Sequence, residues 1–329
     1  MTDNQSRLPL EPMDPRLTNI QPGGGIIIHL EQRWGYWRRW WLKTFRKGYV
    51  ARMQACRKGT VNGCPHEVLD PRDLKYFRNQ PNYWWEPQDD PFIGRNDWPF
   101  ARVGLAELIA FSILFFGPAI GLTAYLVCSQ LAGPLSYFLW TIVVALVLTG
   151  TEVVWFFRNP KRIVPTEPGL VISPADGKVV LIEEIEHDEF IGGPAVLIGI
   201  FLSIFNVHIN RSPVEARVIG LRYKPGKYLN ALRPESAREN EQVAIRLEEN
   251  VAPYRRMIVR QITGAIARRI VCWLKPGDEL GRGAQFGMIK LGSRTELLVP
   301  KEEALEIITK VGDTVLAGES ILARYRGRD

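Results

Sequence analysis

Two long apolar stretches dominate the pattern of hydrophobic and polar positions in the first half of the chain. Residues 108–128 and 131–151 each lack a charged side chain. At about 1.5 Å of rise per residue, either stretch as a helix would cross a hydrocarbon core about 30 Å thick. The link Ser129-Gln130 is short and Gly133-Pro134 follows it, so the pattern predicts a two-helix transmembrane hairpin within 103–157. A buried helical pair in a soluble core is the alternative.

Basic residues on both sides of this hairpin predict its orientation. Arg95 and Arg102 precede it, further basic residues lie within 158–162, and the turn has none. Positive charges near membrane spans stay on the cytoplasmic side. The sequence therefore predicts a cell (plasma or inner) membrane location, with the N-terminus and the C-terminal region both cytoplasmic. The polar N-terminus lacks the apolar core of a cleaved signal peptide, so none is expected.

The pattern changes after Pro160, where short β-branched runs alternate with glycine, proline and aspartate turns. This alternation is typical of a mainly β domain, here 158–329. Two similar stretches begin at Lys275-Pro-Gly-Asp and Lys310-Val-Gly-Asp. This weak repeat is similar to the barrel-sandwich hybrid of biotinyl and lipoyl domains, although a carrier lysine in its usual turn is missing. The predicted strands are 169–172, 178–183, 195–202, 216–223, 256–262, 269–274, 288–291 and 296–299.

The N-terminal extension, residues 1–100, differs from the β domain in composition and in its pattern of hydrophobic residues. Residues 1–25 are rich in proline and glycine, which favours disorder. Residues 33–58 carry nine basic side chains and no acidic one, and Trp34, Trp37, Trp41 and Phe45 recur at helical spacing. A helix with one aromatic face among arginines is typical of an element that lies on a membrane surface. A helix packed on the rest of the protein is the alternative.

Charge and cysteine content limit the kinds of binding partner, disulfide and metal site that we expect. The net charge is +7, and the basic excess gathers in residues 211–270, which favours anionic lipid or acidic substrates. Nothing resembles a nucleic-acid-binding motif, so no nucleic-acid partner is expected. Four scattered cysteines do not form a disulfide framework. Cys56, Cys64 and His66 could ligate zinc, but a fourth ligand is missing, and no metal site is expected.

Gly292-Ser293 is a candidate for self-cleavage. A serine hydroxyl can attack the preceding peptide carbonyl, and the resulting ester can eliminate to dehydroalanine, which hydrolyses to a pyruvoyl group. Glycine before the serine removes the Cβ that would crowd the attacked carbon. Most Gly-Ser pairs are ordinary turns, so the pair alone carries little weight.

Three segments together supply an activated nucleophile. Asp176 could orient His208, and His208 could accept the proton of Ser293. A serine hydrolase is one alternative, but the Gly-x-Ser-x-Gly elbow is absent around Ser293. A non-catalytic, membrane-anchored scaffold or carrier on a lipoyl-like β fold is another.

Six strings around these residues form an ordered set: Phe156-Phe-Arg-Asn-Pro-Lys-Arg162, Ser173-Pro-Ala-Asp-Gly-Lys178, Asn206-Val-His-Ile-Asn-Arg211, Tyr223-Lys-Pro-Gly-Lys-Tyr-Leu-Asn230, Glu239-Asn-Glu241 and Phe286-Gly-Met-Ile-Lys-Leu-Gly-Ser293. Over residues 156–325, this set resembles phosphatidylserine decarboxylase proenzymes.

The resemblance implies a pyruvoyl-dependent lyase that makes phosphatidylethanolamine and CO₂ through a Schiff base to a self-generated pyruvoyl group at Ser293. It implies cleavage into a β chain, 1–292, and an α chain, 293–329, and His208 as the acid and base. Phospholipid and the membrane are the expected partners, and a homodimer is left open. The candidate substrate-binding residues are Asn206, Asn210, Arg211, Lys224 and Lys227.

One departure from the family concerns Arg211. Another branch carries two histidines three residues apart in this segment, and here Arg211 occupies the second place. Either His208 serves both cleavage and decarboxylation, or another group substitutes. The sequence leaves open whether the lipid is ester-linked or ether-linked.

Overall fold

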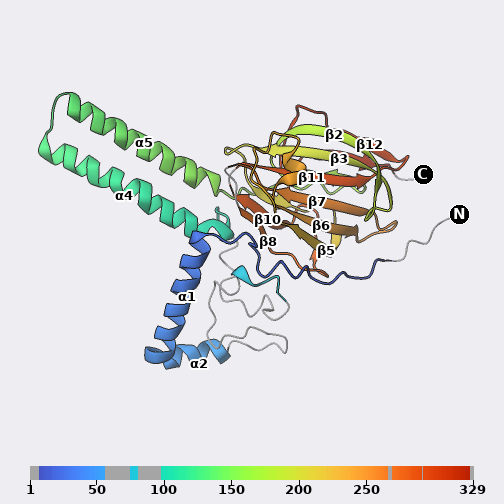
Figure 1. Ribbon diagram of the computed structural model, residues 1–329, viewed down its shortest axis with the longest axis horizontal. Helices are drawn as coiled ribbons and strands as arrows, with labels where there is room; N and C mark the ends of the chain where they lie inside the picture. Colours follow the sequence, from blue (N-terminus) through green and yellow to red (C-terminus); the bar gives the residue numbers. More distant parts are fainter. Residues whose placement is uncertain (1–6, 56–74, 81–97, 266–268, 291, 327–329) are drawn as a thin grey trace. The chain divides into compact units, whose positions relative to one another are not determined.

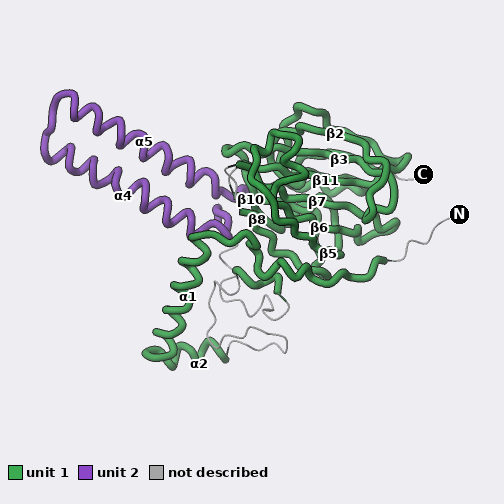
Figure 2. The backbone as a smooth tube through the Cα atoms, in the orientation of Figure 1, with its two compact units in different colours: residues 1–93, 161–329 green, residues 94–160 purple. Residues whose placement is uncertain are grey.

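The computed structural model describes residues 7–55, 75–80, 98–265, 269–290 and 292–326. The chain divides into two compact units, one of residues 94–160 and the other of residues 1–93 and 161–329 (Figure 2). Cys56, Cys64 and His66 lie outside the described residues. Within the described residues, no group of three His, Cys, Asp or Glu side chains is arranged to hold a metal ion.

The smaller unit is a helical hairpin. After a 3-10 turn, η4 (Arg102–Gly104), come α4 (Leu105–Ser129) and α5 (Pro134–Phe156), and both are long and apolar enough to cross a membrane. The second helix begins at 134 rather than the predicted 131 because Gly133 has a φ of 89° and Pro134 occupies the first turn. Ala119, Leu126 and Val143 form the contact between the helices. These helices support membrane association.

The larger unit is mainly β, which confirms the predicted fold class. Its eight-stranded sheet has the order β13-β2-β3-β11-β7-β6-β5-β9 and curls into a half-barrel (Figure 1). The paired strands are antiparallel, and their inward faces build one apolar core. The strands are β2 (Gly177–Asp188), β3 (Gly193–Leu202), β5 (Ala216–Lys224), β6 (Gln242–Glu249), β7 (Arg256–Ile262), β9 (Glu279–Leu280), β11 (Ser293–Pro300) and β13 (Thr314–Val315).

Two three-stranded sheets complete this unit, in the orders β1-β14-β12 and β4-β10-β8. All eight predicted strands are present, β7 with the predicted ends and the others with shifted ends, whereas the sequence missed β6 and several short strands. The strands of the small sheets are β1 (Leu170–Ile172), β4 (Ile209–Arg211), β8 (Arg269–Cys272), β10 (Gln285–Lys290), β12 (Leu305–Ile307) and β14 (Ile321–Tyr325), and one short helix, α6 (Ser236–Glu239), lies between β5 and β6.

The predicted internal repeat has a structural basis in two equivalent turns. In the first, the Asp278 carboxylate accepts the backbone N–H of Lys275 at 3.0 Å. In the second, Asp313 accepts that of Lys310 at 2.8 Å. Each turn has its glycine in a left-handed conformation and leads into a two-residue strand, β9 or β13. The stretches that begin at Lys275 and Lys310 therefore repeat one turn-and-strand unit.

The described part of the N-terminal segment differs from the predicted disorder. Residues 7–25, here called the strap, run in extended form along the β domain. The Glu11 N–H donates to Ile219, and the Asp14 carboxylate accepts the Tyr223 N–H. Ile20 is buried, and its carbonyl accepts the Cys272 N–H on β8. Individual apolar and acidic side chains thus anchor a segment whose composition alone indicates disorder.

Two helices follow the strap, α1 (Ile26–Phe45) and α2 (Lys47–Ala55). The predicted Trp/Arg-rich helix of 33–58 is therefore longer at its start and interrupted at Arg46, which has non-helical backbone angles. The described parts of residues 1–93 belong to the same compact unit as the β domain.

Candidate active site

Ser293 is the first residue of β11, and the neighbouring strands hold it in place on both sides. It pairs with Leu202 of β3, and the next residue, Arg294, pairs with Ile262 of β7. The Ser293 side chain is fully buried, and its hydroxyl oxygen has no hydrogen-bond partner among the described residues. A buried polar atom without a partner costs free energy. The Ser293 hydroxyl therefore has no stabilising hydrogen bond among the described residues that would explain its burial, which makes it a candidate for a chemical role.

Gly292 lies where the chain passes between two sheets. β10 ends at Lys290 in one sheet and β11 begins at Ser293 in the other, so the connection is very short. Gly292 has a φ of +59°, in the left-handed region. Glycine is the residue that adopts this conformation at least cost. The short crossing thus requires a glycine immediately before Ser293.

His208 contacts this bend directly. Its ring is fully buried, and its Nδ1 lies 2.9 Å from the Asn206 carbonyl oxygen. Its Nε2 lies 3.1 Å from the backbone nitrogen of Gly292. Because a carbonyl oxygen accepts and a peptide N–H donates, we assign the proton to Nδ1 and the accepting electron pair, which takes the Gly292 N–H, to Nε2. The imidazole is therefore prepared to act as a base on the side that faces Gly292.

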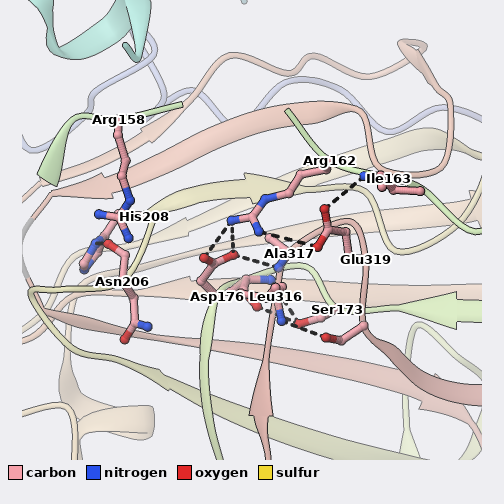
Figure 3. Close-up of polar contacts among 12 residues, drawn as sticks. Arg158, Arg162, Ile163, Ser173, Asp176, Asn206, His208, Leu316, Ala317 and Glu319 are labelled. Atoms are coloured by element: carbon pink, nitrogen blue, oxygen red, sulfur yellow. Dashed lines mark hydrogen bonds and ion pairs between the residues drawn. The ribbon is translucent and has the colours of Figure 1, made fainter. Parts of the chain in front are cut away.

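Asp176 supports His208 through the backbone rather than through the ring. Its carboxylate accepts two hydrogen bonds from Arg162 Nη2, at 2.9 and 2.7 Å, and one from the Ala317 N–H at 2.7 Å (Figure 3). Burial raises the pKa of Asp176, while the Ala317 N–H and Arg162 oppose that rise. The backbone N–H of Val207, the residue before His208, also lowers the pKa of this carboxyl. The carboxylate thus ties three distant segments together next to His208.

A buried polar network lies two residues beyond Ser293. Thr295 accepts a hydrogen bond from Asn210 Nδ2 at 3.1 Å, and Asn210 Oδ1 accepts one from Gln261 Nε2 at 2.8 Å. All three side chains are fully buried. Residues 293 and 295 point to the same face of β11 because strand side chains alternate. Thr295 and Gln261 were missed from sequence, although polar residues within apolar strands were an available signal.

The side chains of Asn206 and Arg211 have structural partners. Asn206 Oδ1 accepts the Ser203 N–H at 2.9 Å and its hydroxyl at 2.7 Å, which closes the turn before His208. Arg211 donates to the Gly283 carbonyl at 3.0 Å and is nearly buried. Burial lowers the pKa of Arg211, as does the charge of Arg162, while Asp176 opposes this. Arg211 therefore belongs to the Asp176 charge cluster.

Lys224 and Lys227 are exposed and close a surface loop. Lys224 Nζ donates to the Arg238 carbonyl at 2.6 Å, and Lys227 Nζ pairs with Glu239 at 2.7 Å. Within the described part of the chain, neither side chain hydrogen-bonds to Ser293 or His208. The structure therefore separates these two candidates from the buried cluster of Ser293, His208 and Asp176.

Gly264 and Asn240 are further residues of the site that the sequence did not reveal. A Cβ at Gly264 would lie 2.4 Å from the carbonyl oxygen of Gly292. Asn240 is fully buried, and its amide donates to the carbonyls of Leu229, at 2.9 Å, and Thr263, at 2.7 Å. Asn240 therefore fixes the backbone beside Gly264, and Gly264 leaves room for the carbonyl that Ser293 would attack.

Comparisons with known proteins identify the family. The family model described as phosphatidylserine decarboxylase matches residues 151–323. A phosphatidylserine decarboxylase proenzyme of Rhodopirellula baltica is 52% identical over 253 residues, which cover 77% of this chain and 99% of that protein. A protein of the same name from Symbiobacterium thermophilum is 41% identical over 234 residues, covering 71% of this chain and 96% of that protein.

Proposed function

Because the chain belongs to the phosphatidylserine decarboxylase family, we propose that it converts phosphatidylserine to phosphatidylethanolamine and CO₂ after cutting its own Gly292–Ser293 bond. The observation that carries the proposal is the contact between His208 Nε2 and the left-handed Gly292, next to a buried Ser293 hydroxyl without a partner. The word proenzyme in the relatives' names supports a precursor that is processed.

Self-cleavage begins with the Ser293 hydroxyl. Its oxygen attacks the Gly292 carbonyl carbon, and its proton passes to His208 Nε2, which gives up its hydrogen bond to the Gly292 N–H. The Asn206 carbonyl still accepts Nδ1–H, so the imidazolium stays in place. The same proton then moves to the Ser293 nitrogen as the C–N bond breaks. The peptide bond is thereby replaced by an ester between Gly292 and the Ser293 oxygen.

Elimination completes the cut. Ser293 loses its Cα proton to a base, its Cβ–O bond breaks, and the Gly292 carboxylate leaves as the new C-terminus of residues 1–292. The dehydroalanine at position 293 takes up water and releases ammonia, which leaves a pyruvoyl group on residues 293–329. The buried position of Ser293 fits this small uncharged group, since it leaves no orphaned hydroxyl.

The sheet keeps the two products together after the cut. β11 belongs to the C-terminal product and pairs with β3 and β7 of the N-terminal product. β13 pairs with β2, and β14 pairs with β1. Separation would break backbone hydrogen bonds and expose the apolar core, so the α and β chains remain one folded unit.

For decarboxylation, a pyruvoyl group at position 293 supplies a carbonyl that takes the substrate amine and accepts the electrons released with CO₂. His208 is placed to move protons at this position, because its Nε2 faces residue 292. Burial around Ser293 excludes bulk water and disfavours a carboxylate relative to CO₂. One imidazole thus serves both cleavage and decarboxylation.

We assign the predicted substrate-binding residues by their accessibility. Lys224 and Lys227 are exposed residues, and their ammonium groups can exchange their contacts within the surface loop for the phosphodiester of the lipid. Asn206, Asn210 and Arg211 already hydrogen-bond within the protein. They therefore act by positioning the His208 and Thr295 segments.

We also infer that α4 and α5 span the cell membrane with the catalytic domain on the cytoplasmic side. The support is the length and apolar character of both helices and the basic residues that flank them in the sequence.

The experiment follows CO₂ release from phosphatidylserine in mixed micelles by the purified full chain. Active protein should lose its activity on treatment with borohydride, which reduces a carbonyl at residue 293 and adds two hydrogens to the 293–329 fragment. Activity that survives complete reduction of that carbonyl would contradict the proposed cofactor. A cleaved protein that releases no CO₂ would favour a scaffold over an enzyme.

A further inference from the structure

Helix α1 carries a continuous apolar stripe that is open to solvent. The stripe consists of Ile26, Leu30, Trp34, Trp37, Trp41 and Phe45, each between 37% and 77% exposed. At about 100° of rotation per residue, these positions fall within an arc of about 100° along the whole helix. Trp34 stacks on Trp37 with ring centroids 5.1 Å apart, and Trp41 and Phe45 are 6.1 Å apart.

The opposite face of α1 is the one that is buried. Ile28, Gly35 and Leu42 are its buried residues, and they lie roughly half a turn away from the stripe. The packing of α1 within the protein therefore uses one face and leaves the larger aromatic face uncovered. Isolated exposed apolar side chains are ordinary, but a contiguous stripe of this size marks an interaction surface.

Positive charge borders the stripe. Arg33 lies on one side of it and Arg38 on the other, by the same helical rotation. Residues 26–47 contain six basic side chains and one acid, Glu31. Glu31 forms an ion pair with Lys75 at 3.0 Å, so its charge does not offset the basic excess. The surface thus combines aromatic rings with cations, and a matching partner must be apolar inside and anionic outside.

We propose that α1 lies in the headgroup region of an anionic membrane leaflet, with the stripe in the outer part of the acyl chains. Tryptophan rings prefer this interface, and arginines beside them reach the lipid phosphates. A groove on a soluble protein would supply apolar contact without a plane of negative charge. The proposal does not depend on self-cleavage or on decarboxylation.

The test uses the full chain in nanodiscs, so that any spanning helices are the same in every sample. Phosphatidylcholine brominated near the headgroup end of its acyl chains quenches tryptophans that lie at that depth. The variant W34F/W37F/W41F removes three of the chain's ten tryptophans and keeps the aromatic stripe. Wild type should lose a larger fraction of its emission than this variant. The difference should grow when phosphatidylglycerol is added and shrink when salt is raised.

A charge variant separates the lipid from other occupants. R33E/R38E should abolish the dependence of quenching on phosphatidylglycerol, while the matched reversal K310E/R326E on the exposed β-domain surface should leave it unchanged. Both variants should still cut at Gly292–Ser293. Equal quenching in wild type and W34F/W37F/W41F would overturn the proposal. A second result would also overturn it. If light scattering found two copies per nanodisc for wild type and one for the charge variant, and brominated lipid did not quench, the stripe would bind a second copy of the chain rather than lipid.

Discussion

The imidazole Nε2 of His208 accepts the backbone N–H of Gly292 at 3.1 Å. This contact joins a base with a fixed tautomer to a glycine held in a left-handed conformation. It lies one residue before the serine whose hydroxyl is buried without a partner. In the proposed mechanism, the same histidine first holds the bend and then takes the serine proton.

Replacement of His208 by glutamine should separate these two tasks. The glutamine carbonyl can accept the Gly292 N–H, but it cannot carry a proton at neutral pH. General acid–base catalysis contributes roughly 10²- to 10⁴-fold in rate, so we expect self-cleavage to slow by at least about 100-fold. The rate is measured by gel or mass from the time of purification. H187Q is the matched control on an exposed histidine, and a normal cleavage rate in H208Q would remove His208 from the mechanism.

Gly264→Ala should block the same step from the other side. Its Cβ would lie 2.4 Å from the Gly292 carbonyl oxygen, so the scissile peptide must move. Overpacking of this kind costs about 1–3 kcal/mol, and each 1.36 kcal/mol in the barrier is about tenfold in rate. We expect cleavage to slow by roughly tenfold or more.

The control for Gly264 is Gly281→Ala, where a new Cβ meets nothing within 4 Å. Both variants should be folded by circular dichroism before cleavage is timed. Equal cleavage rates in the two variants would show that the contact with Gly292 does not matter.

Asp176 and Arg162 should behave as one unit. Their buried ion pair at 2.7 Å leaves an uncompensated charge when one partner is removed, which typically costs about 3–5 kcal/mol. D176N and R162Q should therefore each lower thermal stability and slow cleavage. The double variant should lose less thermal stability than the sum of the losses in the two single variants. Strict additivity in the thermal midpoints would mean that the pair is not coupled.

The strap should contribute a pH-dependent part of the stability. Burial raises the pKa of Asp14, but hydrogen bonds from Arg16 and the Tyr223 N–H outweigh it and lower the pKa to about 2. A lowered pKa gives stability that is present above the unfolded value of 3.8 and is lost as pH falls toward 2. D14N should therefore cost up to about 2 kcal/mol at neutral pH.

The pH series itself is the check on Asp14. The difference in thermal midpoint between D14N and wild type should close between about pH 4 and pH 2, because wild type then also becomes neutral at this position. A difference that stays constant through this window would show that the Asp14 charge does not anchor the strap.

The sequence predicted the β domain well because its strands alternate regularly, but two features escaped it for the same physical reason. β6 was missed because Arg246 and Glu248 interrupt its apolar pattern, and both side chains bind the strap, at Glu11 and at the Leu8 N–H. The strap looked disordered because its anchors are single residues such as Ile20. The charged residues of β6 and the order of the strap depend on each other through these contacts. Contacts between segments so distant in sequence leave no local signal in either segment.

In the candidate site, too, some residues have a local sequence signal and others depend on the folded structure. Ser293, His208 and Gly292 were candidates because the proposed chemistry needs those residue types, and the structure brings them together. Gly264 could not be predicted, because its role depends on a carbonyl from another strand. The placement of Asp176 near Val207, the residue before His208, also depends on folded geometry.

The intact mass of the purified full chain tests the central claim most directly. We predict two polypeptides, residues 1–292 and residues 293–329, the smaller being about one ninth of the 37.4 kDa precursor. The smaller fragment should be lighter by one ammonia than a peptide that begins with serine, and it should have no free α-amine. Ser293→Ala should remain a single chain. A single uncleaved wild-type chain that releases CO₂ from phosphatidylserine would contradict the account.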